Sequence, residues 1–167
     1  FNTTMERTHA GYLDYYLVHA IQRGNYQKYE DLGIWDYVRG LKEQGLVRHY
    51  GFSFHGDPEL LEELLNRHPD AEFVQLQINY LDWESPALRA RECYEIAEKY
   101  GKEIIVMEPV KGGTLASLKP ELEQLYKAVR PEASVASWAL RFAASLDNVM
   151  MVLSGMSTLE QVEDNTA

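Results

Sequence analysis

The sequence predicts an α/β protein in which parallel strands alternate with helices, and two observations lead to this fold class. Five short runs are rich in β-branched and aromatic residues, and the longer segments between them carry apolar residues at helical spacing. This alternation is typical of βα units, which place neighbouring strands parallel in one sheet. The expected strands are residues 12–19, 47–53, 73–78, 103–108 and 149–154.

The helices are predicted from apolar spacing and from residues that begin or end helices. In the segment 33–44, Ile34, Val38 and Leu41 recur at helical intervals, and Gly45 follows as a C-cap glycine. Asp57-Pro58 has the order expected of an N-cap and a first helical residue. Further helices are expected over 87–100, 121–129 and 134–144, and another begins at residue 158.

The length is compatible with two architectures. Five units in 167 residues give about 33 residues each, whereas a complete (β/α)8 barrel needs roughly 250 residues. The chain therefore fits about five-eighths of a barrel, and it fits a complete doubly wound sheet of flavodoxin type equally well. It lacks an initiating Met and stops just after a strand and the start of a helix, which favours one domain, 1–167, cut from a larger barrel.

Composition and charge exclude several classes of function. With 46% hydrophobic and 25% charged residues, the chain is typical of a globular protein. Its formal net charge of −10 disfavours nucleic acid and anionic membrane surfaces, since both are bound through Lys and Arg. No apolar run reaches the roughly 18 residues of a membrane helix, and no secretion signal is evident. The single cysteine, Cys93, indicates a reducing, cytoplasmic setting and a chain with no metal site.

Polar residues at the carboxyl ends of the expected strands are the candidate site residues, because ligands bind at this edge of parallel sheets. Gln75 and Gln77 lie on one face of their strand, and a buried amide without a partner costs roughly 1–3 kcal/mol, which favours a ligand there. The strand-end set comprises His19; Ser53 and His55; Gln75, Gln77 and Asn79; Glu108, Lys111, Gly112 and Gly113; and Ser154, Gly155, Met156 and Ser157.

Motifs in four segments follow one another at consistent spacing. They are LDYYLVH at 13–19, GLVRHYGFSF at 45–54, VQLQINYLD at 74–82, and LSGMS at 153–157 followed by Gln161 and Asn165. Together they resemble strands four, five, six and eight of the aldo/keto reductase family, NAD(P)H-dependent oxidoreductases built on a (β/α)8 barrel. The sequences of 51–56, 106–113 and 152–158 are similar to those of a bacterial and archaeal branch of this family, whose members often carry a 4Fe–4S segment after the barrel.

The resemblance implies a role for each matching residue near the nicotinamide. His19 is the expected catalytic histidine, which hydrogen-bonds the substrate carbonyl oxygen and orients it. Ser53 and Gln75 are expected to bond the nicotinamide carboxamide. Met107 stands where an aromatic usually stacks on the nicotinamide, and a thioether also packs on a ring. Phe54 replaces the asparagine that usually follows the strand-five serine.

The resemblance also implies where the rest of the cofactor binds. The Lys and Arg that usually select a 2′-phosphate are missing, since Gly155 and Gln161 stand near those positions, so both NAD and NADP stay open as the cofactor. The backbone of the segment 111–113 would approach the pyrophosphate, and the start of the last helix would hold the adenosine phosphates. The expected cofactor residues beyond the nicotinamide are Lys111, Gly112, Gly113, Gly155, Met156, Ser157, Gln161 and Asn165.

The family's catalytic aspartate, tyrosine and lysine lie on the first three barrel units, which this sequence lacks. The resemblance therefore implies a parent oxidoreductase acting on an aldehyde, ketone or sugar-like carbonyl, and a 167-residue chain without reductase activity of its own. With one cysteine, the chain cannot include the 4Fe–4S segment.

Two other classes stay open, and an assembly is expected. The chain fits a non-catalytic cofactor-binding or regulatory module, and it fits an isomerase or aldolase in which Lys111 forms a Schiff base or Glu108 acts as a base. Because an open barrel leaves strand edges unpaired, we expect two or more copies to associate through these edges as a homo-oligomer.

Overall fold

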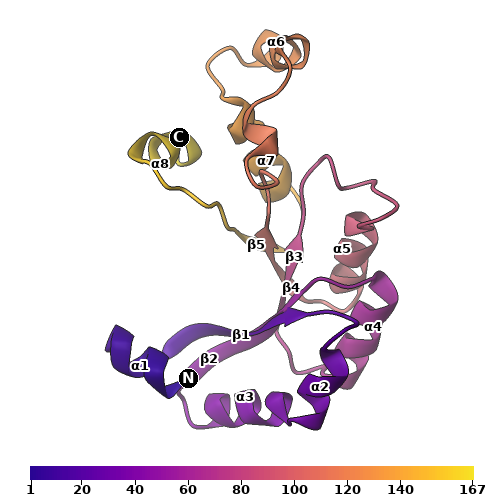
Figure 1. The fold of residues 1–167 in the computed structure, drawn as a ribbon, viewed down its shortest axis with the longest axis vertical. Helices are drawn as coiled ribbons and strands as arrows, with labels where there is room; N and C mark the ends of the chain where they lie inside the picture. Colours follow the sequence, from indigo (N-terminus) through magenta and orange to yellow (C-terminus); the bar gives the residue numbers. More distant parts are fainter. The chain divides into compact units, whose positions relative to one another are not determined.

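The computed structural model describes residues 1–167, and its five strands confirm the predicted α/β class (Figure 1). The strands pair in parallel, and their order in the sheet follows the sequence. A flavodoxin-type sheet requires the order 2-1-3-4-5, so the sequential order excludes that alternative and fits part of a (β/α)8 barrel. The strands are β1 (Leu13–Ile21), β2 (Val47–Phe54), β3 (Phe73–Gln77), β4 (Glu103–Met107) and β5 (Val149–Val152).

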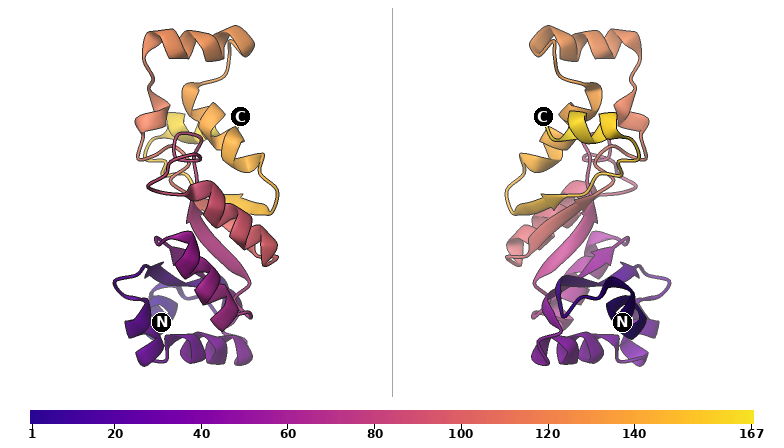
Figure 2. Two further views of the ribbon diagram at one scale, coloured as in Figure 1. Left: turned by 90° about the vertical axis from the view of Figure 1, so that its right-hand side faces the viewer. Right: turned by 90° about the vertical axis from the view of Figure 1, so that its left-hand side faces the viewer.

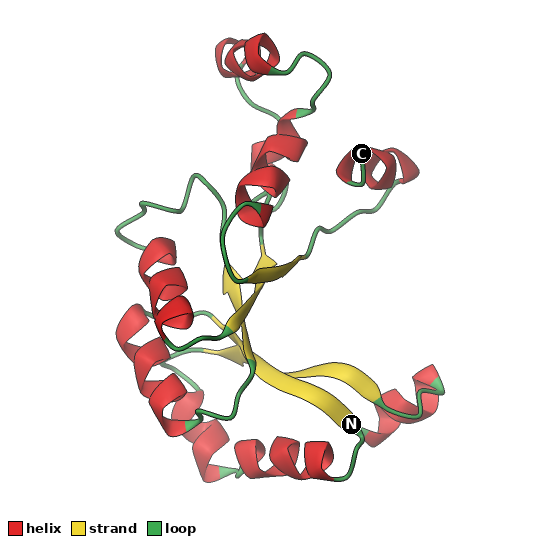
Figure 3. Cartoon of the chain, turned by 180° about the vertical axis from the view of Figure 1, so that it is seen from behind, coloured by secondary structure: helices red, strands yellow, loops and turns green.

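Helices separate consecutive strands, and the expected ones are confirmed within about three residues at each end (Figure 3). Two short helices near the amino terminus and one 3-10 turn were not predicted. Neither short helix contains a buried residue, so the apolar periodicity that reveals an amphipathic helix is missing. The helices are α1 (Asn2–Thr8), α2 (Tyr26–Asp31), α3 (Ile34–Glu43), α4 (Pro58–Arg67), α5 (Ala90–Lys99), α6 (Pro120–Val129), α7 (Val135–Ala144) and α8 (Leu159–Asn165), with the 3-10 turn η1 at Thr114–Ala116.

The chain forms two compact units, and β3 and α5 each contribute residues to both. Unit 1 contains residues 1–75 and 95–103, and unit 2 contains residues 76–94 and 104–167.

The core of unit 1 lies between β2 and the helices α3 and α4. Strand β2 is buried continuously from Tyr50 to Phe54, as expected of a parallel strand covered on both faces. Helix α3 packs against β1 and β2. Helix α4 buries four leucines completely, at the spacing that the sequence predicted. The four are Leu60, Leu61, Leu64 and Leu65.

Both predicted helix signals of unit 1 are confirmed in detail. After α3, Gly45 has φ +72°, its N–H donates to Lys42, and the Leu46 N–H donates to Leu41. These two bonds form a Schellman motif, which requires the left-handed conformation that glycine adopts readily. At α4, the Asp57 carboxylate accepts from the Leu60 N–H at 3.0 Å, as an N-cap should.

Asp57 also binds Arg23, which makes its contribution to stability dependent on pH. The Arg23 guanidinium donates to both carboxylate oxygens, at 2.6 and 2.5 Å, and this hydrogen bonding lowers the pKa of Asp57 to about 2. Asp57→Asn keeps an N-cap and loses the ion pair, so we expect a loss of only about 0.2–1 kcal/mol at pH 7. Asp57→Ala loses the cap as well, and about 0.5–2 kcal/mol more.

Because the folded-state pKa is depressed, the ion pair stabilises the fold above about pH 4 and its contribution disappears as the pH falls toward 2. Urea unfolding followed by circular dichroism between pH 7 and 3 should therefore show the difference between wild type and Asp57→Asn shrinking with acid. A difference that stays constant over this range would contradict the assignment.

Unit 2 is built on the pair β4 and β5, with α7 packed against β5 and α8 against α7. A cluster of aromatic rings joins α6 and α7 to the segment that follows β3. Phe142 of α7 packs edge to face on Tyr80 and Trp83, and Tyr126 of α6 packs on Trp138 of α7. Helix α6 buries no residue, and Figure 2 shows it at the outer end of this unit. None of the helices is both long and apolar enough to span a membrane.

Candidate functional site

The first group of predicted site residues lies at the carboxyl ends of β1 and β2 in unit 1. His19 is exposed near the end of β1, and the Tyr29 hydroxyl donates to its backbone carbonyl at 3.1 Å. The next residue, Ala20, has φ +55°, and its N–H donates to the Ser53 Oγ at 2.7 Å. Ser53 is completely buried, so its hydroxyl fixes the backbone that carries His19.

Gln75 pairs directly with Ser53 across β2 and β3. The structure thus brings three predicted residues, His19, Ser53 and Gln75, to one edge of unit 1. A serine hydroxyl carries one proton and two acceptor sites. The Ala20 N–H uses an acceptor site of Ser53, and the hydroxyl proton stays available for a carbonyl oxygen.

The loop after β4 has an unusual backbone. Glu108 and Lys111 have φ +56° and +49°, and Gly112 and Gly113 have φ +59° and +92°. A left-handed conformation suits glycine but costs a residue with a Cβ about 1–2 kcal/mol. The regular structure of β4 ends at Met107, and this loop runs into η1.

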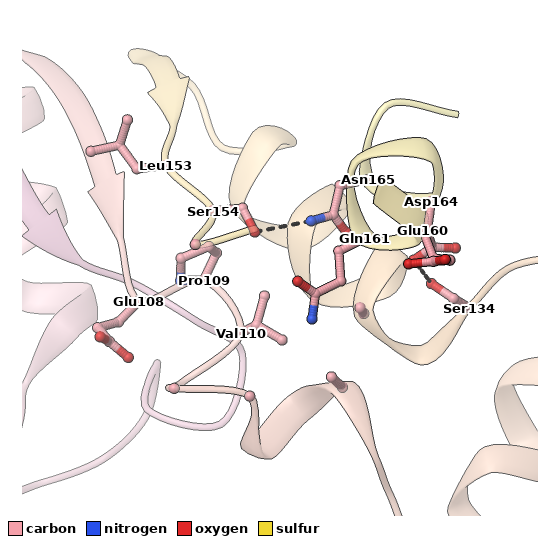
Figure 4. Close-up of a pocket in the computed structure, with 15 residues that line it drawn as sticks. Glu108, Pro109, Val110, Ser134, Leu153, Ser154, Glu160, Gln161, Asp164 and Asn165 are labelled. Carbon is pink, nitrogen blue, oxygen red and sulfur yellow. Dashed lines mark hydrogen bonds between the residues drawn. The ribbon is translucent and has the colours of Figure 1, made fainter. Parts of the chain in front are cut away.

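A pocket of about 440 Å³ lies in unit 2 between this loop and the helices α7 and α8 (Figure 4). Two hydrogen bonds cross its wall, from Asn165 Nδ2 to Ser154 Oγ at 3.0 Å and from Ser134 Oγ to Asp164 Oδ2 at 2.6 Å. Met156 lines a neighbouring pocket instead. The predicted cofactor residues that do line this one are Gly112, Gly113, Gly155, Gln161 and Asn165.

Helix α8 begins at the mouth of the pocket with a capping box. The Thr158 Oγ1 accepts from the Gln161 N–H at 3.3 Å, and the Gln161 Oε1 accepts from the Thr158 N–H at 3.2 Å. The same Gln161 oxygen accepts from the Ser157 N–H at 2.7 Å. The side chains of Thr158 and Gln161 therefore organise the start of the helix.

The pocket is acidic. Its lining contains the carboxylates of Glu108, Glu160 and Asp164 and no Lys, Arg or His. The pKa of Glu160 is lowered by its own backbone N–H and by the Thr158 hydroxyl, as expected for a carboxylate in the first turn of a helix. Sequence reasoning missed Ser134, Glu160 and Asp164, because they reach the pocket from helices and not from strand ends. No group of three His, Cys, Asp or Glu side chains is arranged to hold a metal ion.

Lys111 and Met107 lie outside the pocket lining. The Lys111 ammonium pairs with the Asp82 carboxylate. A Schiff-base lysine must present its amine to the substrate, whereas this amine is held by Asp82 and Lys111 does not line the pocket. This contact therefore disfavours the aldolase alternative. Met107 is half-buried at the end of β4, and its carbonyl accepts from the Ile78 N–H at 3.2 Å.

Parallel strands in sequential order, with polar residues at their carboxyl ends, define part of a (β/α)8 barrel. The sequence profile of the aldo/keto reductase family matches residues 1–167, and the chain belongs to this family. Comparison with curated proteins gives no significant match.

Solved structures of aldo/keto reductases share the fold. AKR11C1 from Bacillus halodurans in its apo form has 23% identity and a TM-score of 0.77, over 98% of this chain and 58% of that protein. The enzyme from Klebsiella pneumoniae, in complex with NADP and acetate, has 19% identity and a TM-score of 0.71, over 98% of this chain and 56% of that protein. The enzyme from Brucella melitensis has 20% identity and a TM-score of 0.74, over 99% and 58%.

The chain thus spans a little over half the length of these relatives, which confirms the predicted partial barrel. The branch with a 4Fe–4S segment stays a prediction.

Proposed function

We propose that this chain supplies the cofactor-binding part of an NAD(P)H-dependent reductase of aldehydes or ketones. The observation that carries the proposal is the placement of His19, Ser53 and Gln75 at the carboxyl ends of three consecutive parallel strands in a chain of the aldo/keto reductase family. Oxidoreductases of this class place the nicotinamide and the carbonyl at this edge of the barrel.

The residues at this edge fit a nicotinamide. Ser53 has a proton to donate to the carboxamide oxygen, and Gln75 lies next to it with an amide side chain. When bound, the cofactor supplies the hydride. His19 is exposed, and it would hydrogen-bond the substrate carbonyl oxygen and hold it in position. Completing the reaction requires a proton donor, which we assign to barrel units outside this chain.

Considered by itself, the pocket of unit 2 fits an adenosine diphosphate group. A volume of about 440 Å³ is that of a typical small-molecule site. The glycines 112 and 113 let a diphosphate approach the backbone closely. Three carboxylates and no cation favour a ribose with a free 2′-hydroxyl over a 2′-phosphate. NAD is therefore the preferred cofactor of this proposal, although the Klebsiella pneumoniae relative is in complex with NADP.

Calorimetric titration of the chain with NADH, NADPH and ADP-ribose tests the assignment. We expect NADH to bind more tightly than NADPH, and no oxidation of either in the presence of an aldehyde. Ser53→Ala should weaken NADH about fivefold, because a lost hydrogen bond is worth roughly 1 kcal/mol. ADP-ribose lacks the nicotinamide, so its affinity should not change. Equal losses for both ligands, or no binding by wild type, would contradict the proposal.

A non-catalytic binding module on the same fold is the second candidate. It predicts the same binding but no carbonyl reduction by any form of the protein that carries the whole barrel. The expected association of copies through open strand edges is part of our proposal, and light scattering at micromolar concentration checks it.

A further inference from the structure

We propose that Asp82 is a positioning residue that holds the Glu108–Gly113 loop in the shape that forms the pocket wall. The part of this inference that concerns ligand affinity rests on the proposed function of the pocket. The part that concerns the loop does not.

Asp82 is the centre of a buried polar cluster in unit 2. It is 3% exposed, and Asn79 is completely buried. The Asn79 Nδ2 donates to the Asp82 Oδ2 at 2.9 Å, and the Asp82 N–H donates to the Asn79 Oδ1 at 2.9 Å. Lys111 donates to the other carboxylate oxygen, and Gln77 adds a further side-chain hydrogen bond. Burial raises the pKa of Asp82, but these hydrogen bonds outweigh it and leave the pKa below its ordinary value.

The cluster binds the loop at Glu108 and at Lys111, the first and last residues of its strained part. The Asn79 Nδ2 donates to the Glu108 carbonyl at 3.2 Å, and Asp82 holds the Lys111 ammonium. Glu108 and Lys111 are the two residues of this loop that have a Cβ and a left-handed backbone. Such conformations persist only where surrounding contacts fix them. Each strained residue therefore has its own anchor in the cluster.

The anchored loop is also the wall of the pocket. Glu108, Pro109, Val110, Gly112 and Gly113 line it, while the side chain of Lys111 is held by Asp82. Without the anchors, the two strained residues would return to ordinary backbone conformations. The wall would then move, although Asp82 does not itself line the pocket. A buried ion pair selects one conformation at a cost in stability, and here that conformation is the pocket-forming one.

Amide hydrogen exchange of the full chain tests the positioning role directly. The N–H groups of Gly113, Thr114 and Leu115 donate within the loop, to Val110, Lys111 and Val110 respectively. Asp82→Asn removes the carboxylate and replaces the ion pair with Lys111 by a weaker hydrogen bond to a neutral acceptor, so exchange at these three amides should rise about 10- to 100-fold. Exchange in the middle of α7 should stay within twofold of wild type.

Two further variants separate positioning from a general loss of stability. Lys111→Arg keeps a cation that can pair with Asp82, so exchange in the loop should stay as slow as in wild type. Glu123→Gln removes an exposed ion pair with Lys127 on α6 of the same unit, and it should leave the loop unchanged. A uniform rise across unit 2, or no rise at the loop, overturns the proposal.

If Asp82→Asn does not fold, Lys111→Gln decides the question in its place. This variant leaves Asp82 with its bonds from Asn79 and Gln77, so the buried carboxylate keeps partners. The same confined rise in exchange is expected, and its absence overturns the proposal.

Titration with ADP-ribose tests the consequence for the pocket. Asp82→Asn should weaken ADP-ribose about tenfold or more, and Lys111→Arg should weaken it by less than threefold. If wild type does not bind ADP-ribose, the proposed function of the pocket fails, and the exchange experiment still decides whether Asp82 positions the loop.

Discussion

Gly51→Ala is expected to destabilise the protein by about 3 kcal/mol, the upper end of the cost of overpacking a core. Gly51 lies in the middle of β2 and pairs with Phe73 of β3. A Cβ on Gly51 would lie 2.7 and 2.8 Å from two ring carbons of Phe73, and closer still to its carbonyl oxygen. Phe73 is 1% exposed and belongs to the sheet, so neither its ring nor its backbone has room to move.

Gly40→Ala is the matched control, because the same chemical change should act in the opposite direction. Gly40 lies inside α3, where a Cβ would meet only the end of the Gln44 side chain, at 3.8 Å. Alanine in a helix interior is favoured over glycine by about 0.5–1 kcal/mol. Urea denaturation should therefore show a lower midpoint than wild type for Gly51→Ala and a higher midpoint than wild type for Gly40→Ala. Similar midpoints for the two variants would contradict the close packing of β2 on β3.

His19→Ala is expected to lower kcat/KM for carbonyl reduction about 10²- to 10³-fold in a form of the protein that carries the whole barrel. That range is typical for removal of one donor to the reacting oxygen. Because the histidine is proposed to contact the substrate and not the cofactor, the affinity for NADH should change by less than twofold. Steady-state oxidation of NADH with an aldehyde measures the first quantity, and fluorescence titration measures the second.

His55 provides the control for this substitution. It is also an exposed histidine at the carboxyl end of a strand. Its backbone N–H donates to the Ile21 carbonyl at 2.8 Å. His55→Ala keeps that bond, so turnover should stay within about twofold of wild type. If the two variants lose equal activity, His19 has no special part in the reaction.

Periodicity predicted the strands and the longer helices well, and in several of them a buried stripe accounts for the pattern, although α6 buries no residue. Val47 to Phe54 and the leucines of α4 are examples in which burial and local pattern agree. Helices α1 and α2 bury nothing, so their sequences lack a pattern to detect. The strand order, which excluded the flavodoxin alternative, depends on pairing between distant segments and is not encoded in local spacing.

The candidate site was predictable only where its residues lie on strands or follow them directly. Ser53 and Gln75 are an example, because they lie on neighbouring parallel strands and pair with each other. Lys111 shows the limit, since its partner Asp82 is 29 residues away and cannot be identified from spacing. Glu160 and Asp164 were missed because the packing of α8 brings them to the pocket, and their charge is what favours NAD in our proposal.

Because of the capping box, a ligand that hydrogen-bonds the Gln161 side-chain oxygen would loosen the first turn of α8. Gln161 Oε1 accepts from the N–H groups of Ser157 and Thr158, and it cannot serve a ligand without releasing them. A capping interaction is worth about 0.5–2 kcal/mol, which corresponds to roughly a 2- to 30-fold weaker apparent affinity for any ligand that takes this oxygen. A substitution that removes the Gln161 side chain would therefore loosen the first turn of α8 and at the same time take away the oxygen that such a ligand would use.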